Sequence, residues 1–195
     1  MLYMSVLIGI MSVATSYWWW TIDWWRPLTI TGTKVGIEDF ITGFAAGGIM
    51  ATIYEVIFKR AFYKRALHHH VHGGLTILLI LAMTTSWLFW GIGFSSFHAA
   101  ILAMSFIAVL MILVRRDLFW NALLSGFLML LVSLPFYYSI ILISPEWIDK
   151  TYLTDLSGVR VTGIPVEELI FWFFAGLVWG PFYEYWQGNK LRRMK

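Results

Sequence analysis

The sequence contains no cysteine among its 195 residues, which excludes disulfide bonds and metal sites built from thiolates. Charged residues are also scarce, at 13% of the chain, whereas an average soluble domain has about a quarter. Hydrophobic residues account for 59%. These proportions exclude an ordinary soluble domain and predict a single all-α transmembrane domain over residues 1–195.

Several motifs of known enzyme classes are also absent. The chain has no pair of Asp-rich motifs to hold a diphosphate through Mg²⁺, no G-x-G-x-x-G after a strand, no serine elbow and no H-E-x-x-H. A histidine-rich stretch, "HHHVH" at residues 68–72, follows a basic segment, so we interpret it as a solvated face and expect no metal site. The class of activity that remains after these exclusions is acid–base chemistry by carboxyl groups in an apolar environment.

Long apolar runs are abundant. A helix needs about 20 apolar residues to cross a bilayer, and six runs in the chain approach this length. We therefore predict six transmembrane helices, approximately over 2–20, 38–58, 74–92, 96–114, 118–143 and 166–186. Two longer polar connections, roughly 21–37 and 144–165, would then lie on the same side of the membrane.

The distribution of charge predicts the orientation. Ten of the fourteen Lys and Arg residues fall on one side of the predicted bundle, and eight of the eleven acids fall on the other. Because basic loops stay in the cytoplasm, we predict a protein of the cytoplasmic membrane with both termini cytoplasmic. The basic side holds Lys59, Arg60, Lys64, Arg65, Arg115, Arg116, Lys190, Arg192, Arg193 and Lys195, and the acidic side holds Asp23, Glu38, Asp39, Glu146, Asp149, Asp155, Glu167 and Glu168.

The chain also contains an internal repeat. Residues 36–58 read "GIEDFITGFAAGGIMATIYEVIF" and residues 163–186 read "GIPVEELIFWFFAGLVWGPFYEYW". Because the second copy comes four spans after the first, we predict a parallel repeat of a loop and a helix, 22–58 and 148–186, within repeats of about 1–58 and 118–186. A shift of 129 residues aligns Glu38 with Glu167, Asp39 with Glu168, Gly47 with Gly176, Tyr54 with Tyr183 and Glu55 with Glu184.

Each copy starts with two adjacent acids, which suggests a functional site. Capping is the simplest interpretation, because acids at a helix start complement the helix dipole. A helix start needs only one acid, however, and acids beside a lipid-length segment are costly and usually functional. We therefore expect Glu167 and Glu168 to be catalytic, with Glu38 and Asp39 as partners across a shared cavity.

The acids at the far end of the same two runs are expected to be structural. Glu55 and Glu184 follow the second acid of each pair by 16 residues, or about 24 Å of helix, so they cannot share a site with the acids at the helix start. Lys59 follows Glu55 by one helical turn, which is the spacing of an ordinary ion pair.

The second copy resembles a known family. Pro165, Glu167 and Glu168 form a P-x-E-E motif that opens an aromatic helix, and an "ID…G" loop precedes it. This duplicated pattern resembles the lycopene cyclase domain family, the small membrane carotenoid cyclases of heterodimeric bacterial and fused archaeal and fungal types. The similarity covers about 22–58 and 148–186. The first copy departs from the motif, because "GIEDF" lacks the proline and has Asp39 as its second acid.

The resemblance implies an isomerase, or intramolecular lyase, that closes the ψ-ends of lycopene or a related carotenoid into β-rings. The reaction is redox-neutral, so we expect no flavin, nicotinamide or metal cofactor. We expect a lipophilic polyene and membrane lipids as partners, and no nucleic acid. One chain should suffice for activity, with homodimerisation left open.

The residues themselves fit this chemistry. A carboxyl group can protonate an alkene, and aromatic faces can stabilise the carbocation that forms. We expect the substrate to contact Phe171, Trp172, Trp20, Trp24 and Pro165. The alternative is a non-enzymatic accessory membrane protein that binds or transports a carotenoid or lipid.

Overall fold

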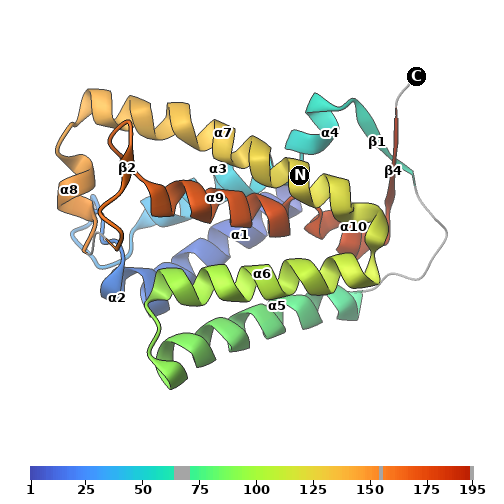
Figure 1. Cartoon of the computed structure of the whole chain (residues 1–195), viewed down its shortest axis with the longest axis horizontal. Helices are drawn as coiled ribbons and strands as arrows, with labels where there is room; N and C mark the ends of the chain where they lie inside the picture. The colour runs from blue at the N-terminus through green and yellow to red at the C-terminus, as the bar shows by residue number, and fades with distance from the viewer. Residues whose placement is uncertain (64–70, 154–155, 194–195) are drawn as a thin grey trace.

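The computed structural model describes residues 1–63, 71–153 and 156–193, and these residues are mostly helical (Figure 1). The N-terminal half contains α1 (Leu2–Thr15), η1 (Ser16–Trp20), α2 (Thr21–Asp23), α3 (Ile37–Met50), α4 (Ile53–Ile57), β1 (Arg60–Tyr63), α5 (Val71–Ser86) and η2 (Trp87–Ile92). The C-terminal half contains α6 (Ser96–Val114), η3 (Arg116–Leu118), α7 (Phe119–Ile143), α8 (Trp147–Thr151), β2 (Arg160–Val161), β3 (Ile164–Pro165), α9 (Val166–Trp179), α10 (Phe182–Gln187) and β4 (Lys190–Arg193).

Within the part of the chain that the structure describes, four helical stretches are long and apolar enough to cross a membrane, and they match four of the six predicted spans. Large apolar side chains are exposed on them, for example Met83 and Leu113 at 71% and 62%. Such a surface suits lipid tails rather than water. The helices therefore support an integral membrane protein. The four stretches are Leu2–Asp23, Gly73–Ile92, Ser96–Val114 and Arg116–Ile143.

The other two predicted spans, 38–58 and 166–186, are each broken into two helices. Two residues separate α3 from α4, and two separate α9 from α10. The prediction of continuous helices was therefore wrong at these points. Pro181 has no N–H to continue α9. Thr52 takes a non-helical φ of −134°, and its hydroxyl donates to the carbonyl oxygen of Gly48 at 2.8 Å.

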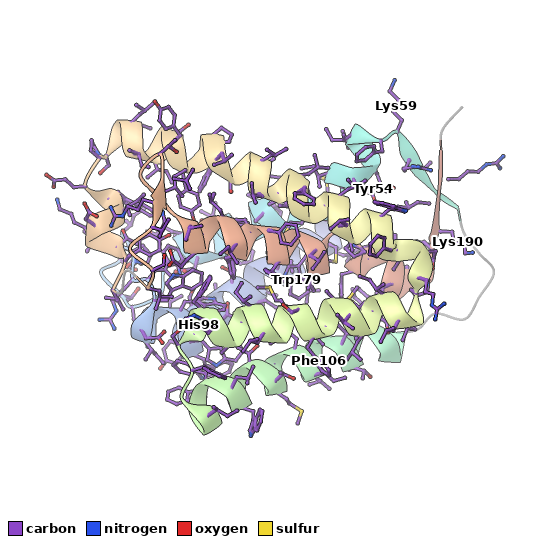
Figure 2. All side chains as sticks on the ribbon, viewed as in Figure 1. Tyr54, Lys59, His98, Phe106, Trp179 and Lys190 are labelled. Carbon is purple, nitrogen blue, oxygen red and sulfur yellow. The ribbon has the colours of Figure 1, made fainter. Side chains whose placement is uncertain are left out.

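Two helix pairs form the interior of the bundle. α3 packs along α1 and α9 packs along α7, and α3 and α9 run in the same direction (Figure 1). Glycines permit the close approach: a Cβ added to Gly47 would lie 2.7 Å from the Cβ of Ile8, and one added to Gly176 would lie 2.9 Å from the Cβ of Met129. The core extends to α6, with Trp179 of α9 buried beside that helix (Figure 2).

Backbone pairing joins segments that are far apart in the sequence at both ends of the bundle. At one end, β1 pairs antiparallel with β4. At the other end the two polar loops meet: the N–H of Arg26 donates to the carbonyl of Thr151 at 2.7 Å, and the N–H of Leu153 donates to that of Trp24 at 2.8 Å. The two loops therefore lie at the same end, as predicted.

Candidate active site

A short β-hairpin brings the first acids of α9 into the interior. Thr162 and Gly163, between β2 and β3, have positive φ values of 53° and 87°, which is the geometry of a two-residue hairpin turn. Pro165 ends the hairpin and occupies the N-cap position of α9. Glu167 and Glu168 are consequently only 4% and 5% exposed, although they lie in a first helical turn next to a loop.

Glu168 lies in a cluster of phenol and indole groups. The hydroxyl of Tyr137 on α7 donates to Oε2 of Glu168, and the indole Nε1 of Trp172 donates to the Tyr137 hydroxyl oxygen at 3.3 Å. The buried hydroxyl of Tyr152, just after α8, lies beside Glu168 and Tyr137. Burial and the nearby Glu168 carboxyl group raise the pKa of Tyr152, so this phenol stays protonated at neutral pH and can donate a hydrogen bond.

Glu167 is bound to the loop and not to this cluster. Its Oε1 accepts a hydrogen bond from the N–H of Ser157 at 2.8 Å. Glu38, the aligned residue of the first copy, accepts one from the N–H of Ile30 at 2.6 Å. In both copies, therefore, the first acid holds the preceding loop in place.

Asp39 is held as a helix cap. Its Oδ1 accepts from the Ser16 hydroxyl at 2.6 Å and its Oδ2 accepts from the N–H of Gly36 at 3.0 Å. Gly36 is the N-cap of α3 and Asp39 is the third helical residue, which is the geometry of a capping box. The residue of α9 that corresponds to Gly36 is Pro165, which has no N–H to offer Glu168.

The predicted substrate-binding aromatic residues lie together. Trp20 and Trp24, at the end of the first span, contact Phe171 edge to face, with ring centroids 5.8 and 5.2 Å apart. Phe171 in turn contacts Trp172 at 5.8 Å, and Trp172 donates to Tyr137. These rings form a continuous aromatic path that leads to the carboxyl group held by Tyr137.

The four predicted catalytic acids are divided between the two copies. The hydrogen bonds described for Glu38 and Asp39 go to residues 16, 30 and 36, and those for Glu167 and Glu168 go to residues 137 and 157. The structure thus brings Glu168 to the aromatic path, and Pro165 shapes the start of its helix. Sequence reasoning missed Tyr137 and Tyr152, since no local spacing marks either residue.

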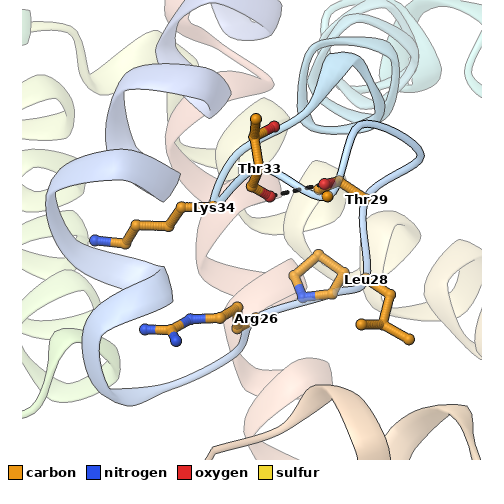
Figure 3. Close-up of a pocket in the computed structure, with 7 residues that line it drawn as sticks. Arg26, Leu28, Thr29, Thr33 and Lys34 are labelled. Atoms are coloured by element: carbon orange, nitrogen blue, oxygen red, sulfur yellow. Dashed lines mark hydrogen bonds between the residues drawn. The ribbon is translucent and has the colours of Figure 1, made fainter.

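A hollow of about 360 Å³ lies in the loop that precedes α3 (Figure 3). It is lined by residues between Arg26 and Lys34. The Arg26 guanidinium donates to the carbonyl of Thr21 at 2.8 Å, and the Lys34 ammonium donates to that of Tyr17 at 3.2 Å. Both cations are therefore already hydrogen-bonded to backbone carbonyls.

The residues described here give no metal centre. No three His, Cys, Asp or Glu side chains within 1–63, 71–153 and 156–193 are close enough to hold an ion. Residues 68–70 of the histidine-rich stretch lie outside these ranges.

The segment from α6 to α10, which supplies Tyr137, Trp172 and Glu168, is similar to a known family. Residues 95–186 match the lycopene cyclase family. The resemblance drawn from the P-x-E-E motif is thereby confirmed for this segment, and the lycopene cyclase family implies an isomerase-type cyclase. No curated protein and no solved structure matches the chain. Trp20 and Trp24 lie outside the matched residues.

Proposed function

We propose that this protein is a redox-neutral lycopene β-cyclase in which Glu168 handles the proton. The observation that carries the proposal is the position of Glu168 within the matched family segment. Its carboxyl group is buried, accepts a hydrogen bond from Tyr137 and lies at the end of an aromatic path. General acid–base catalysis needs such a carboxyl group shielded from water, because the alkene is a weak base.

The proposed reaction consumes no net proton, because Glu168 gives one proton to the substrate and takes one back from it. The protonated Glu168 carboxyl gives its proton to the terminal trisubstituted alkene of the polyene, which leaves a tertiary carbocation. The neighbouring double bond attacks this cation, a carbon–carbon bond closes the ring, and the positive charge moves onto the ring. The Glu168 carboxylate then removes a ring proton, which forms the ring double bond and restores the carboxylic acid. No electrons are gained or lost.

The surrounding residues have supporting roles in this scheme. Tyr137 and Tyr152 orient the carboxyl group and stabilise it while it is ionised. The faces of Trp20, Trp24 and Phe171 stabilise the carbocation by about 0.5–2 kcal/mol each and offer no nucleophile that could trap it. Glu167, Glu38 and Asp39 hold the loops and helix starts around the site.

Substitution of the two adjacent glutamates in cells that make lycopene tests this assignment. Glu168→Gln keeps the size of the side chain but removes the titrating proton, so we expect ring formation to be lost while the protein still accumulates in the membrane. Glu167→Gln is the matched control, since an amide oxygen can still accept from Ser157. Chromatography of the pigments measures the outcome, and β-rings made at normal rates by Glu168→Gln would contradict the proposal.

The same experiment tests the accessory-protein alternative. A carrier would leave lycopene uncyclised in cells that express the wild-type chain, and the pigment would copurify with the protein. A cyclase converts the pigment, and the conversion depends on Glu168.

We also propose that the chain is a parallel repeat with both termini cytoplasmic. In support, each half packs a helix with acids at its start along a preceding helix, and each binds the first acid to a loop N–H. The basic strands β1 and β4 lie at the end opposite the acidic loops (Figure 1). Because the chain has no native cysteine, Leu28→Cys and Val159→Cys should label from outside intact cells and Lys190→Cys should not. The reverse pattern would contradict the orientation.

A further inference from the structure

A second pair of acids lies buried at the end of the bundle away from Glu168. Glu55 on α4 is 8% exposed and Glu184 on α10 is fully buried. The predicted ion pair of Glu55 with Lys59 is not formed, although the structure describes both residues. Lys59 has a left-handed backbone, with φ 49°, and its side chain points away from the bundle (Figure 2). The carboxyl group of Glu55 instead faces that of Glu184 within interaction range.

The neighbours leave part of this pair without a donor. The Asn121 amide nitrogen donates to Oε1 of Glu184 at 3.1 Å, and Ser125 fixes the amide by donating to its oxygen at 3.0 Å. Oε2 of Glu184 and both carboxyl oxygens of Glu55 are buried without a hydrogen-bond partner. Three buried acceptor atoms on two facing acids therefore need a ligand that donates to them.

Among the residues that the structure describes, no cation forms an ion pair with either acid. Arg115 donates to the backbone carbonyl of Glu184 at 3.3 Å, but its guanidinium forms two hydrogen bonds of 2.8 Å with the carboxylate of Asp117. Its charge is thus already paired. The other titratable or charged residues on the adjoining elements are Tyr54, Lys59, Arg60, Tyr63, His72, Arg116, Tyr183, Tyr185, Lys190, Arg192 and Arg193.

We propose that Glu55 and Glu184 form a proton-binding site in which the two carboxyl groups share one proton. Two buried carboxylates that face each other cannot both ionise without a large cost from desolvation and repulsion. One proton between them supplies an O–H···O hydrogen bond, which is among the short, strong types in proteins, and lowers the charge of the pair to a single negative unit. Asn121 then stabilises that remaining charge.

This site connects the two halves of the chain and is independent of the cyclisation site. Glu55 belongs to the N-terminal half, whereas Glu184 lies within the matched family segment. The shared proton attaches α4 to α10 just beyond the two breaks in the helices. Loss of that proton at high pH leaves two like charges in contact, so we expect the contact, and with it the folded protein, to weaken as the pH rises.

Infrared spectroscopy and thermal unfolding of the purified protein in detergent test the site. The Glu168→Gln variant is the starting protein, so that the carboxyl group of the proposed cyclisation site does not contribute to the spectra. We expect a carbonyl band of a neutral carboxylic acid that persists at pH values where exposed carboxyl groups are ionised. Adding Glu55→Gln or Glu184→Gln should remove that band, because the amide replaces the proton as the donor.

The same two substitutions should abolish the loss of thermal stability at alkaline pH. Glu146→Gln is the matched control, since Glu146 is exposed and forms an ion pair with Lys150, and it should change neither measurement. If the variants that combine Glu168→Gln with Glu55→Gln or Glu184→Gln do not fold, a pH titration of the Glu168→Gln protein alone replaces them. The absence of a persistent acid band in that titration overturns the proposal. A stability that rises with added Na⁺, Mg²⁺ or Ca²⁺ at constant ionic strength would identify a metal cation and overturn the proton assignment.

Discussion

The starts of α3 and α9 each carry two adjacent acids but hold the second acid in different ways. In both helices the first acid accepts a hydrogen bond from a loop N–H. Asp39 then turns back to cap its own helix, with Gly36 and Ser16 as donors. Glu168 turns away from its helix start to Tyr137. The first arrangement is that of a structural cap, and the second leaves a carboxyl group available for chemistry.

The difference follows from the residue at the N-cap. A glycine N–H attracts the carboxylate at the third helical position, as in α3. A proline in the same place has no N–H and cannot attract it. The P-x-E-E motif thus combines an acid bound to the loop, an acid bound to Tyr137, and a proline that offers the second acid no N–H at the cap.

Shortening the second acid of α9 should have the largest effect. Glu168→Asp keeps the charge but withdraws the carboxyl group from Tyr137, and a misplacement of about 1 Å can cost about 100-fold in rate. We expect ring formation to fall by that order, measured by pigment chromatography at equal protein levels. Asp39→Glu is the reciprocal change, and it should leave turnover near the wild-type value. Equal losses in both variants would remove the distinction between the two helix starts.

Removing the phenol hydroxyl should have the next largest effect. A hydrogen bond to a charged group contributes about 1.5–3 kcal/mol, so Tyr137→Phe should slow ring formation by about 10- to 100-fold, since each 1.4 kcal/mol is tenfold. The rate at saturating substrate should fall more than the apparent affinity. Ser16→Ala removes the corresponding hydroxyl beside Asp39, and it should lower thermal stability without slowing turnover.

Restoring the N–H at the start of α9 should give a smaller loss. Pro165→Gly offers Glu168 a cap of about 0.5–2 kcal/mol, which competes with the contact to Tyr137 and should reduce turnover by about 2- to 30-fold. The melting temperature should stay constant or rise. A parallel loss of stability and turnover would indicate that the proline matters only for packing.

The smallest effect on turnover is expected at the cap of α3. Asp39→Asn keeps an acceptor for Ser16 but weakens the capping box, so the protein should lose about 0.5–2 kcal/mol of stability. Denaturation and pigment assays on the same preparation measure both quantities. A loss of ring formation comparable to that in Glu168→Gln would make Asp39 a catalytic residue.

Features set by composition and spacing were predictable from the sequence. Long apolar runs predicted four helices that the structure contains, and the even number of spans between the polar loops placed both at one end. Position along the chain predicts that the aromatic residues Trp20, Trp24, Phe171 and Trp172 lie at a similar depth. The structure places these rings in contact, and their role in substrate binding stays a prediction.

Features that depend on long-range packing were not predictable. Tyr137 precedes Glu168 by 31 residues in an apolar helix, and only the packing of α7 on α9 joins them. Glu55 was assigned to Lys59 because their spacing suits one helical turn, but α4 ends at Ile57, before Lys59. The break at Pro181 did have a local signal, since a proline after a glycine is a frequent point of interruption.

The backbone pairings at both ends of the bundle determine where it can open. The pairing of β1 with β4 closes one end, and the bonds between the two polar loops close the other. Helices that are joined at both ends cannot separate at their ends. We therefore expect the least costly movement to separate them near the middle of their length. A molecule as long and apolar as a carotenoid would then enter sideways from the lipid, and its rate of entry would depend on the fluidity of the membrane and not on the viscosity of the water outside.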